Sequence, residues 1–272
     1  MARIAVLQAV SEVGAPKANL ALIRRAAVRA ADAGADLLVT PELFATGYAP
    51  AQAAGSDGAA MRSQLATIAD EEGIGVVAST VENDAGTSFI TASLFDETGT
   101  ELLRYRKAHL FGDEERSAFT PGAGVPRTAD FRGLRVALGI CYDIEFPEYA
   151  RAAVRAGADL LCIPTAVPAT GDVGGPQPLN TYNAERISTL LVPARALENG
   201  VYIAYANHAG PGFTGCSVIA SPYGTLLAAA ATDGEELLLT DIHPAEAQRA
   251  RRINTYAQDM RPELYRWGAA RN

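Results

Sequence analysis

The chain is organised around the segment Arg135-Val-Ala-Leu-Gly-Ile-Cys141-Tyr-Asp-Ile-Glu145-Phe-Pro147-Glu-Tyr149. Residues 136–140 form a short apolar run, which is typical of a strand that is buried on both faces. Pro147 suits the first turn of a helix, where its missing N–H costs nothing, and we expect this helix to end at Gly157. The sequence therefore places Cys141 at the C-terminal end of a strand, in the turn that leads into a helix.

Two interpretations of Cys141 are open. A free cysteine is most often a small, buried apolar residue. At a strand-to-helix junction, however, its thiol would lie near backbone N–H groups that stabilise a thiolate and, later, an oxyanion. Three carboxylates follow it, at Asp143, Glu145 and Glu148, and a core strand rarely continues into such a run. We therefore interpret the segment as a functional site.

Length and composition limit the class of protein. With 272 residues, of which 49% are hydrophobic, the chain is long enough for one large α/β domain or two small ones. The net charge of −8 argues against nucleic acid as a partner, because proteins that bind the phosphate backbone need a basic surface. No apolar run is long enough to span a bilayer, so no membrane contact is expected. The three cysteines are scattered without a pairing pattern, which favours a cytoplasmic location.

The pattern of apolar residues predicts an α/β order whose second half repeats the first. We expect strands at 4–8, 36–40, 74–80, 88–95, 101–105, 136–140, 158–164, 201–207, 217–221, 226–230 and 237–241, and helices at 19–32, 59–70, 147–156, 190–199 and 244–254. Segments 35–41 and 158–164 match closely, and each follows an alanine-rich helix and a glycine, which suggests two similar layers related by an internal twofold. Coincidence between common strand–helix sequences is the alternative. Irregular segments are expected at 108–133 and 171–178.

Three motifs follow one another along the chain: Pro41-Glu42, Tyr105-Arg-Lys107-Ala-His-Leu-Phe, and Gly139-Ile-Cys141-Tyr-Asp-Ile-Glu-Phe-Pro-Glu148. Together they resemble the nitrilase (carbon–nitrogen hydrolase) superfamily over nearly the whole chain, and within it the aliphatic amidases such as 5-aminopentanamidase. The resemblance implies one domain over residues 1–272, an α/β fold in which two mixed sheets and outer helices form a four-layer α-β-β-α sandwich. It also implies a homodimer or a larger homo-oligomer, for which the tail at about 255–272 is a candidate arm.

The resemblance implies a catalytic triad of Glu42, Lys107 and Cys141, and each residue type has a chemical reason to be there. A thiol needs a base to become a nucleophile at neutral pH, and Glu42 would take its proton and later return it to the leaving nitrogen. Lys107 would stabilise the oxyanion together with the backbone N–H of Tyr142. Each residue alone is a weak signal, because an isolated glutamate or lysine at a strand end is usually solvated. The ordered combination is specific.

Further carboxylates have two interpretations each. In the family, the position of Glu115 often holds an acid that orients the substrate and the lysine; alternatively, residues 113–115 are a solvated acidic run. Glu145 would pair with an ammonium group of the substrate, as in amidases that act on ω-amino amides; alternatively, it forms a structural ion pair with an arginine. Tyr48 and Asn207 are candidates for lining the pocket. Val167 departs from relatives, which often carry an asparagine there, and this departure affects the substrate side of the pocket.

The resemblance implies an amidase that hydrolyses the C–N bond of small aliphatic primary amides, including ω-amino amides, to a carboxylic acid and ammonia through a cysteine thioester. A nitrilase and an N-carbamoyl amine amidohydrolase would use the same triad, whereas a non-catalytic scaffold protein on this fold would lack one of its residues. A Cys–His hydrolase is a rival scheme, with His109 or His208 as the base. The partner is a small-molecule amide. No metal and no cofactor are expected, because neither ligand spacing nor a dinucleotide-binding glycine motif occurs.

Overall fold

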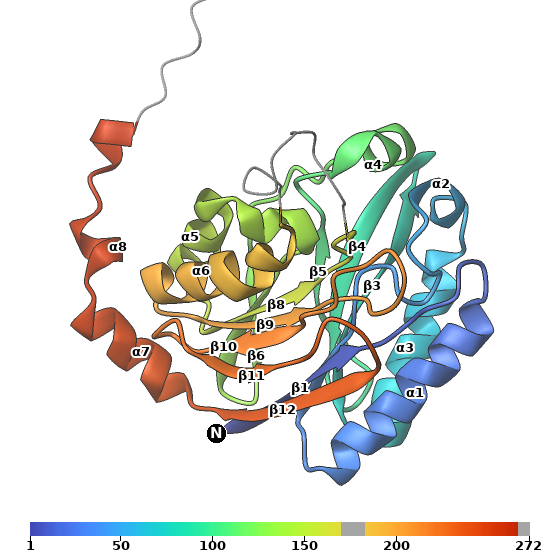
Figure 1. Cartoon of the computed structure of the whole chain (residues 1–272), viewed down its shortest axis with the longest axis horizontal. Coiled ribbons are helices and arrows are strands. Elements are labelled where there is room, and N and C mark those ends of the chain that lie inside the picture. Colours follow the sequence, from blue (N-terminus) through green and yellow to red (C-terminus); the bar gives the residue numbers. More distant parts are fainter. Residues whose placement is uncertain (170–182, 266–272) are drawn as a thin grey trace, which may run out of the picture.

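The computed structural model describes residues 1–169 and 183–265, which form two six-stranded sheets that lie face to face with helices outside them (Figure 1). The first sheet has the order β12-β1-β2-β3-β4-β5, and the second has the order β11-β10-β9-β8-β7-β6. The strands are β1 (Ala2–Gln8), β2 (Leu37–Val39), β3 (Gly75–Asp84), β4 (Thr87–Phe95), β5 (Glu101–Arg106), β6 (Thr128–Phe131), β7 (Leu134–Leu138), β8 (Leu160–Pro164), β9 (Tyr202–Ala206), β10 (Val218–Ala220), β11 (Leu226–Ala229) and β12 (Glu236–Ile242).

Helices cover the outer face of each sheet, so the predicted α-β-β-α sandwich is confirmed. Helices α1 (Pro16–Asp32) and α3 (Gly58–Glu72) pack on the first sheet, and α5 (Pro147–Arg155) and α6 (Val192–Asn199) lie outside the second (Figure 1). The other helical segments are α2 (Pro50–Ala53), α4 (Gly112–Ala118), η1 (Cys141–Glu145), η3 (Ile187–Leu191), α7 (Pro244–Ile253), α8 (Tyr256–Asp259) and η4 (Pro262–Tyr265). In the described residues, no helix has both the length and the apolarity that crossing a membrane requires.

The strands next to the middle of each sheet are apolar on both faces because both faces are buried. In β1, Ile4 and Val6 belong to the core between the sheets, whereas Ala5 and Leu7 contact the layer of α1 and α3. Successive side chains of a strand point to opposite faces, so such a strand needs a continuous apolar run. This requirement explains why the runs at β1, β2, β7 and β8 were visible in the sequence.

The two sheets share one arrangement of strands, in agreement with the predicted repeat. Strand β2 lies between β1 and β3 and is parallel to both, and β8 lies between β7 and β9 in the same way. Antiparallel strands complete each sheet on both sides. The carboxyl ends of the parallel strands β2 and β8 lead to Glu42 and Thr165. The Glu42 backbone N–H donates to the Thr165 carbonyl (3.1 Å), so these two strand ends meet between the sheets.

Two expectations differ from the structure. The segment expected to be irregular at 108–133 contains α4 and β6, and the helix expected at 190–199 begins as a π-helical turn, η3, before α6. The loop expected at 171–178 lies outside the described residues. Helix α8 and η4 extend from the body (Figure 1) and carry exposed apolar side chains such as Tyr256 and Leu264. The role of the tail as an oligomerisation arm stays a prediction.

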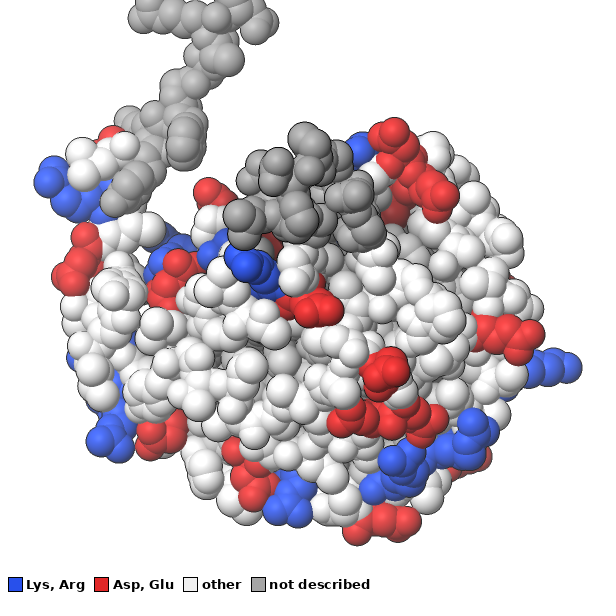
Figure 2. Space-filling view, in the orientation of Figure 1, with Lys and Arg blue, Asp and Glu red and all other residues white. Residues whose placement is uncertain are grey.

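Acidic and basic side chains are intermixed with uncharged ones on the face of the molecule that Figure 2 shows. Over the described residues, several charged side chains pair across elements, as Arg3 does with Asp241 and Arg29 with Glu235. This distribution agrees with the overall acidic charge of the chain and gives this face no uniformly basic character.

Candidate active site

Cys141 lies in the turn between β7 and α5, as the sequence predicted. Its backbone has φ of 47°, a left-handed conformation that costs a residue other than glycine energy and that is concentrated at functional sites. The turn is held by Asp143, whose Oδ2 accepts a hydrogen bond from the Ile140 backbone N–H (2.9 Å). Gly139 is required just before it, because a Cβ there would lie 2.8 Å from the ring of Tyr149. The buried thiol is thereby fixed in one place at the end of the strand.

Glu42 follows β2 and lies completely buried. Its Oε1 accepts a hydrogen bond from Lys107 Nζ (2.8 Å), and its Oε2 has no hydrogen-bond donor among the described residues. Burial raises the pKa of Glu42 to about 8, against the opposing effect of Lys107. Glu42 therefore has one free oxygen and the proton affinity of a base that works near neutral pH.

Lys107 follows β5 and is buried with its charge surrounded by carboxylates. Its Nζ donates to Glu42 Oε1 and to both carboxylate oxygens of Glu115, each at 2.8 Å. Burial alone would lower the pKa of Lys107, but Glu42, Cys141 and Glu115 outweigh burial and raise it above its ordinary value. Lys107 is therefore a permanent positive charge inside the site.

Glu115 is a member of this cluster, and the alternative of a solvated acidic run does not hold for it. It lies on α4 and is fully buried, whereas its neighbours Asp113 and Glu114 are exposed. Besides Lys107, it accepts hydrogen bonds from Tyr48 Oη (2.6 Å) and from the Phe111 backbone N–H (2.8 Å). Tyr48 thus contacts the cluster through its hydroxyl. Burial and the nearby carboxylates raise the pKa of Tyr48, so it acts as a donor.

The electrostatics around Cys141 favour the protonated thiol. Burial raises its pKa well above the ordinary value, and Glu42 and Glu115 raise it further. Lys107 and a hydrogen bond from the Ala166 backbone act in the opposite direction without reversing the shift. A thiol in this state needs a base to react. The assignment of that base to Glu42 stays a prediction.

A small cavity of about 30 Å³ opens at Cys141. Its lining residues are Phe111, Cys141, Glu145, Val167, Pro168, Ala184 and Ile187. Among the described residues, the lining is apolar apart from the thiol and the carboxylate of Glu145. Val167, which was expected on the substrate side of the pocket, therefore belongs to the wall of this cavity.

Glu145 has no ion-pair partner among the described residues, so the structural ion pair considered from the sequence is not formed there. Arg195 donates instead to the backbone carbonyl of Glu145 (2.8 Å) and pairs with Glu198 (3.3 Å). Burial raises the pKa of Glu145 to about 7, and Lys107 and Arg195 partly offset this shift. The carboxylate is therefore available to a group that enters the cavity.

Tyr142 and Asn207, which were also candidates for contacting the substrate, lie on different elements: Tyr142 on η1 and Asn207 directly after β9. Tyr142 is in the first turn of η1, where backbone N–H groups precede the first intrahelical bond, and its ring packs edge-on against Phe146. The buried amide of Asn207 accepts from the N–H groups of Val167 (3.0 Å) and His208 (2.9 Å) and donates to Thr214 Oγ1 and Gly215 O. Its hydrogen-bonding capacity is used within the protein, where it holds the cavity wall at Val167.

The two histidines considered as bases are committed elsewhere, and neither hydrogen-bonds Cys141 within the described parts of the chain. His208 is buried, which lowers its pKa to about 4, so it is neutral and its Nε2 donates to the Glu42 carbonyl (2.6 Å). His109 contacts Asp143 through Nδ1 (2.7 Å). Sequence reasoning assigned no structural role to Asp143 or His208, because the contacts of Asp143 with His109 and of His208 with Glu42 join residues that are far apart along the chain.

The amino-acid sequence matches the family described as carbon-nitrogen hydrolase over residues 3–252. A hydrolase from Pseudomonas protegens is 35% identical over 258 residues, which cover 91% of this chain and 85% of that protein. A 2-oxoglutaramate amidase from Bacillus subtilis is 30% identical over 239 residues, which cover 85% of this chain and 87% of the relative.

The fold is also similar to solved structures of an amidase from Nesterenkonia sp. AN1. One, a mutant with the acetamide moiety of fluoroacetamide added covalently at the active-site cysteine, superimposes with a TM-score of 0.85 at 39% identity and covers 97% of this chain and 95% of that chain. Another mutant, in complex with butyramide, has a TM-score of 0.85 at 39% identity and covers 97% and 96% of the two chains.

Proposed function

The chain belongs to the carbon–nitrogen hydrolase family and is a hydrolytic amidase, and we propose that it releases ammonia from small aliphatic primary amides through a thioester on Cys141. The observation that carries this proposal is the burial of Glu42, Lys107 and Glu115 in one hydrogen-bonded cluster beside a cysteine, although the residues come from separate segments of the chain. A non-catalytic scaffold protein would have no reason to bury this set of charges.

The first half of the proposed reaction forms the thioester. Ionised Glu42 takes the proton of Cys141 as the sulfur attacks the amide carbon, and a C–S bond forms while the carbonyl oxygen becomes an oxyanion. Lys107 Nζ and the Tyr142 backbone N–H stabilise this oxyanion. The intermediate collapses, the C–N bond breaks, and Glu42 returns the proton to the leaving nitrogen, which departs as ammonia.

The second half releases the acid. Glu42 takes a proton from a water molecule, whose oxygen attacks the thioester carbon. The C–S bond then breaks, and the departing thiolate of Cys141 takes the proton from Glu42 while the carboxylic acid leaves. Glu115 keeps Lys107 oriented through both halves, because it holds Nζ with both of its carboxylate oxygens.

The cavity supports a short acyl chain with a cationic end as the preferred substrate. A space of about 30 Å³ beside Cys141 favours small groups. Among the described lining residues Glu145 is the charged one, and it has no ion-pair partner within the described parts of the chain, so it would pair with the ammonium group of an ω-amino amide. The butyramide and acetamide groups in the structures of the Nesterenkonia amidase agree with the small size.

Ammonia release from a panel of amides, nitriles and carbamoyl amines tests the proposal. We expect turnover of small amides, none by Cys141→Ala, and a mass increase equal to the acyl group on trapped wild-type protein. Turnover of nitriles or carbamoyl amines in place of amides would assign the same triad to those reactions. Full activity of Cys141→Ser would contradict a thioester mechanism.

A further inference from the structure

Asp143 accepts four hydrogen bonds from groups around the site. Its Oδ2 accepts from the Tyr105 hydroxyl (2.9 Å) and from the Ile140 backbone N–H (2.9 Å). Its Oδ1 accepts from the backbone N–H of His109 (3.0 Å) and from His109 Nδ1 (2.7 Å). The carboxylate is fully buried, so these four donors replace all of its water.

The four donors come from the two segments that carry the nucleophile and the lysine. Ile140 immediately precedes Cys141, while Tyr105 and His109 stand two residues before and two residues after Lys107. The Tyr105 hydroxyl also accepts from the Ala108 backbone N–H (3.0 Å), which tightens the turn after Lys107. Asp143 therefore connects the end of β5 to the turn after β7.

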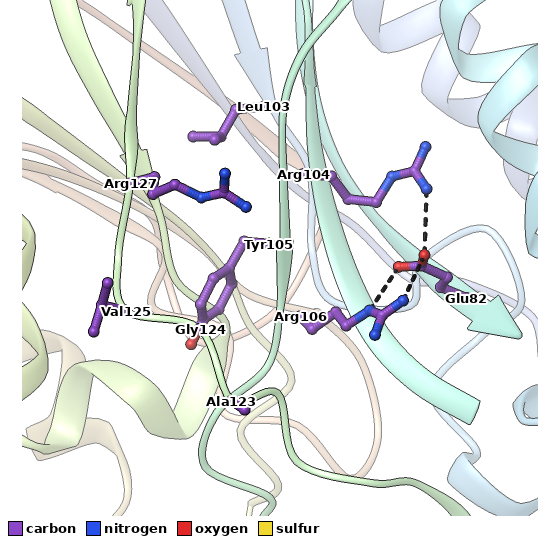
Figure 3. A pocket seen from close by; sticks show the side chains of 9 residues that line it. All are labelled: Glu82, Leu103, Arg104, Tyr105, Arg106, Ala123, Gly124, Val125 and Arg127. Atoms are coloured by element: carbon purple, nitrogen blue, oxygen red, sulfur yellow. Dashed lines mark hydrogen bonds and ion pairs between the residues drawn. The ribbon is translucent and has the colours of Figure 1, made fainter. Parts of the chain in front are cut away.

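The alternation of side chains along β5 makes this connection possible. Figure 3 shows Tyr105 on the opposite side of the strand from Arg104 and Arg106, whose guanidinium groups reach Glu82. Tyr105 thus points to the interior, where it meets Asp143, and Lys107 as the next odd-numbered residue also turns inward to Glu42 and Glu115.

We propose that Asp143 is a positioning residue, which acts with His109 to fix Lys107 Nζ and the strained Cys141 turn relative to one another. The inference rests on the proposed function, because it concerns the geometry in which that thiol attacks. Asp143 does not touch the substrate cavity at Cys141, whose lining residues do not include it. It acts through the backbone on both sides, where a displacement of about 1 Å is enough to lower a rate about 100-fold.

His109 is the position at which this connection can be altered without opening the core. Its side chain is about one third exposed (34%), and its ring stacks on Phe146 with centroids 3.9 Å apart. His109→Ala removes the Nδ1 donor to Asp143. His109→Asn is the matched control, because its amide nitrogen falls near the position of Nδ1 and can donate to the same oxygen.

Two readouts test the proposal on purified full-length variants. We expect His109→Ala to lower kcat for a small amide about 10- to 100-fold with KM within about 2-fold, and His109→Asn to regain most of the loss. The rate at which chloroacetamide alkylates Cys141, followed by protein mass, should fall and recover in the same order. Asp143→Asn should lose more activity than His109→Ala, since it replaces an acceptor oxygen by an NH₂ group that faces donors.

The outcomes separate this inference from the proposed function. If wild-type protein hydrolyses no amide but alkylation still follows the order wild type, His109→Asn, His109→Ala, the proposed function fails and the positioning role stands. If amides are hydrolysed but His109→Ala keeps the wild-type kcat, or His109→Asn is no better than His109→Ala, the positioning role is overturned. Because Asp143→Asn can fail to fold, the His109 pair decides, with thermal unfolding measured on each variant.

Discussion

Lys107 Nζ donates to Glu42 Oε1 at 2.8 Å while both side chains are fully shielded from solvent. Burying charges is costly unless each is paired, and Lys107 is shared by two carboxylates, those of Glu42 and Glu115. One lysine cannot neutralise both, which contributes with burial to the raised pKa of Glu42. The buried cluster therefore contains two carboxylates and one ammonium group, and burial together with this unbalanced charge makes Glu42 a stronger base than an ordinary glutamate.

Replacing the lysine should therefore affect both stability and turnover. Lys107→Met leaves two carboxylates buried without their cation, and we expect the free energy of unfolding to fall by about 3–5 kcal/mol and ammonia release to be lost. Urea denaturation and an ammonia assay measure the two effects. The exposed Lys17→Met is the control and should change the free energy of unfolding by less than about 0.5 kcal/mol. A Lys107→Met protein as stable and active as wild type would show that the cluster is neither structural nor catalytic.

The raised pKa of Glu42 predicts opposite trends of activity and stability with pH. Because the ionised form is the base, kcat/KM should rise with pH through about 8. The folded protein binds a proton that the unfolded chain, with an ordinary glutamate pKa of 4.5, has already released. The contribution of Glu42 to stability is therefore fully present below about 4.5 and is lost as pH rises to about 8.

A pH–rate profile and urea midpoints between pH 5 and 9 measure both trends. Glu42→Gln is the matched variant: it cannot act as a base, so activity should be lost, and the decline in stability over this window should become smaller. A decline that is the same in Glu42→Gln and wild type would assign it to other groups.

Local patterns predicted the strands, and the family resemblance predicted a triad of Glu42, Lys107 and Cys141, but neither indicated the contacts that hold these residues in place. Strand β7 and helix α5 were predictable because a buried apolar run and a proline act within a few residues. Glu42, Lys107 and Cys141 were recognisable because their motifs are continuous in sequence. By contrast, the four donors to Asp143 come from positions up to 38 residues away. The periodic spacing of apolar residues within a helix or strand gives no sign of such contacts.

Short elements that depend on tertiary contacts were missed for the same reason. Helix α4 and strand β6 have 7 and 4 residues, too few for a clear periodic signal, and both lie in the segment expected to be irregular. The burial of Glu115 in α4 follows from its contact with Lys107, whereas the acidic run around it indicates a solvated surface. The left-handed backbone of Cys141 likewise follows from the turn that Asp143 holds.

Glu145 should determine the preference for substrates with a cationic end. Glu145→Gln removes the charge and keeps the shape, so we expect kcat/KM for an ω-amino amide to fall about 10-fold relative to a neutral amide of equal length. Since the pKa of Glu145 is raised to about 7, the wild-type preference for the amino-bearing substrate should grow as pH rises through 7. Glu148→Gln, at an exposed position outside the cavity, is the control. Equal turnover of both amides by wild type, unchanged in Glu145→Gln, would refute the role.

Ile187 should limit the length of the acyl chain. It lies on the π-helical turn η3, and its buried side chain forms part of the wall of the cavity of about 30 Å³ at Cys141. Ile187→Ala removes three carbons from that wall, so a chain longer by one or two methylenes can be buried, and each methylene is worth about 0.8 kcal/mol. The ratio of kcat/KM for hexanamide to that for butyramide should therefore rise about 4- to 15-fold. Leu190→Ala is the matched control, because Leu190 is on the same turn but 58% exposed, and it should leave the ratio unchanged. If both substitutions shift the ratio equally, the change comes from loosening η3, and the wall at Ile187 does not select the chain length.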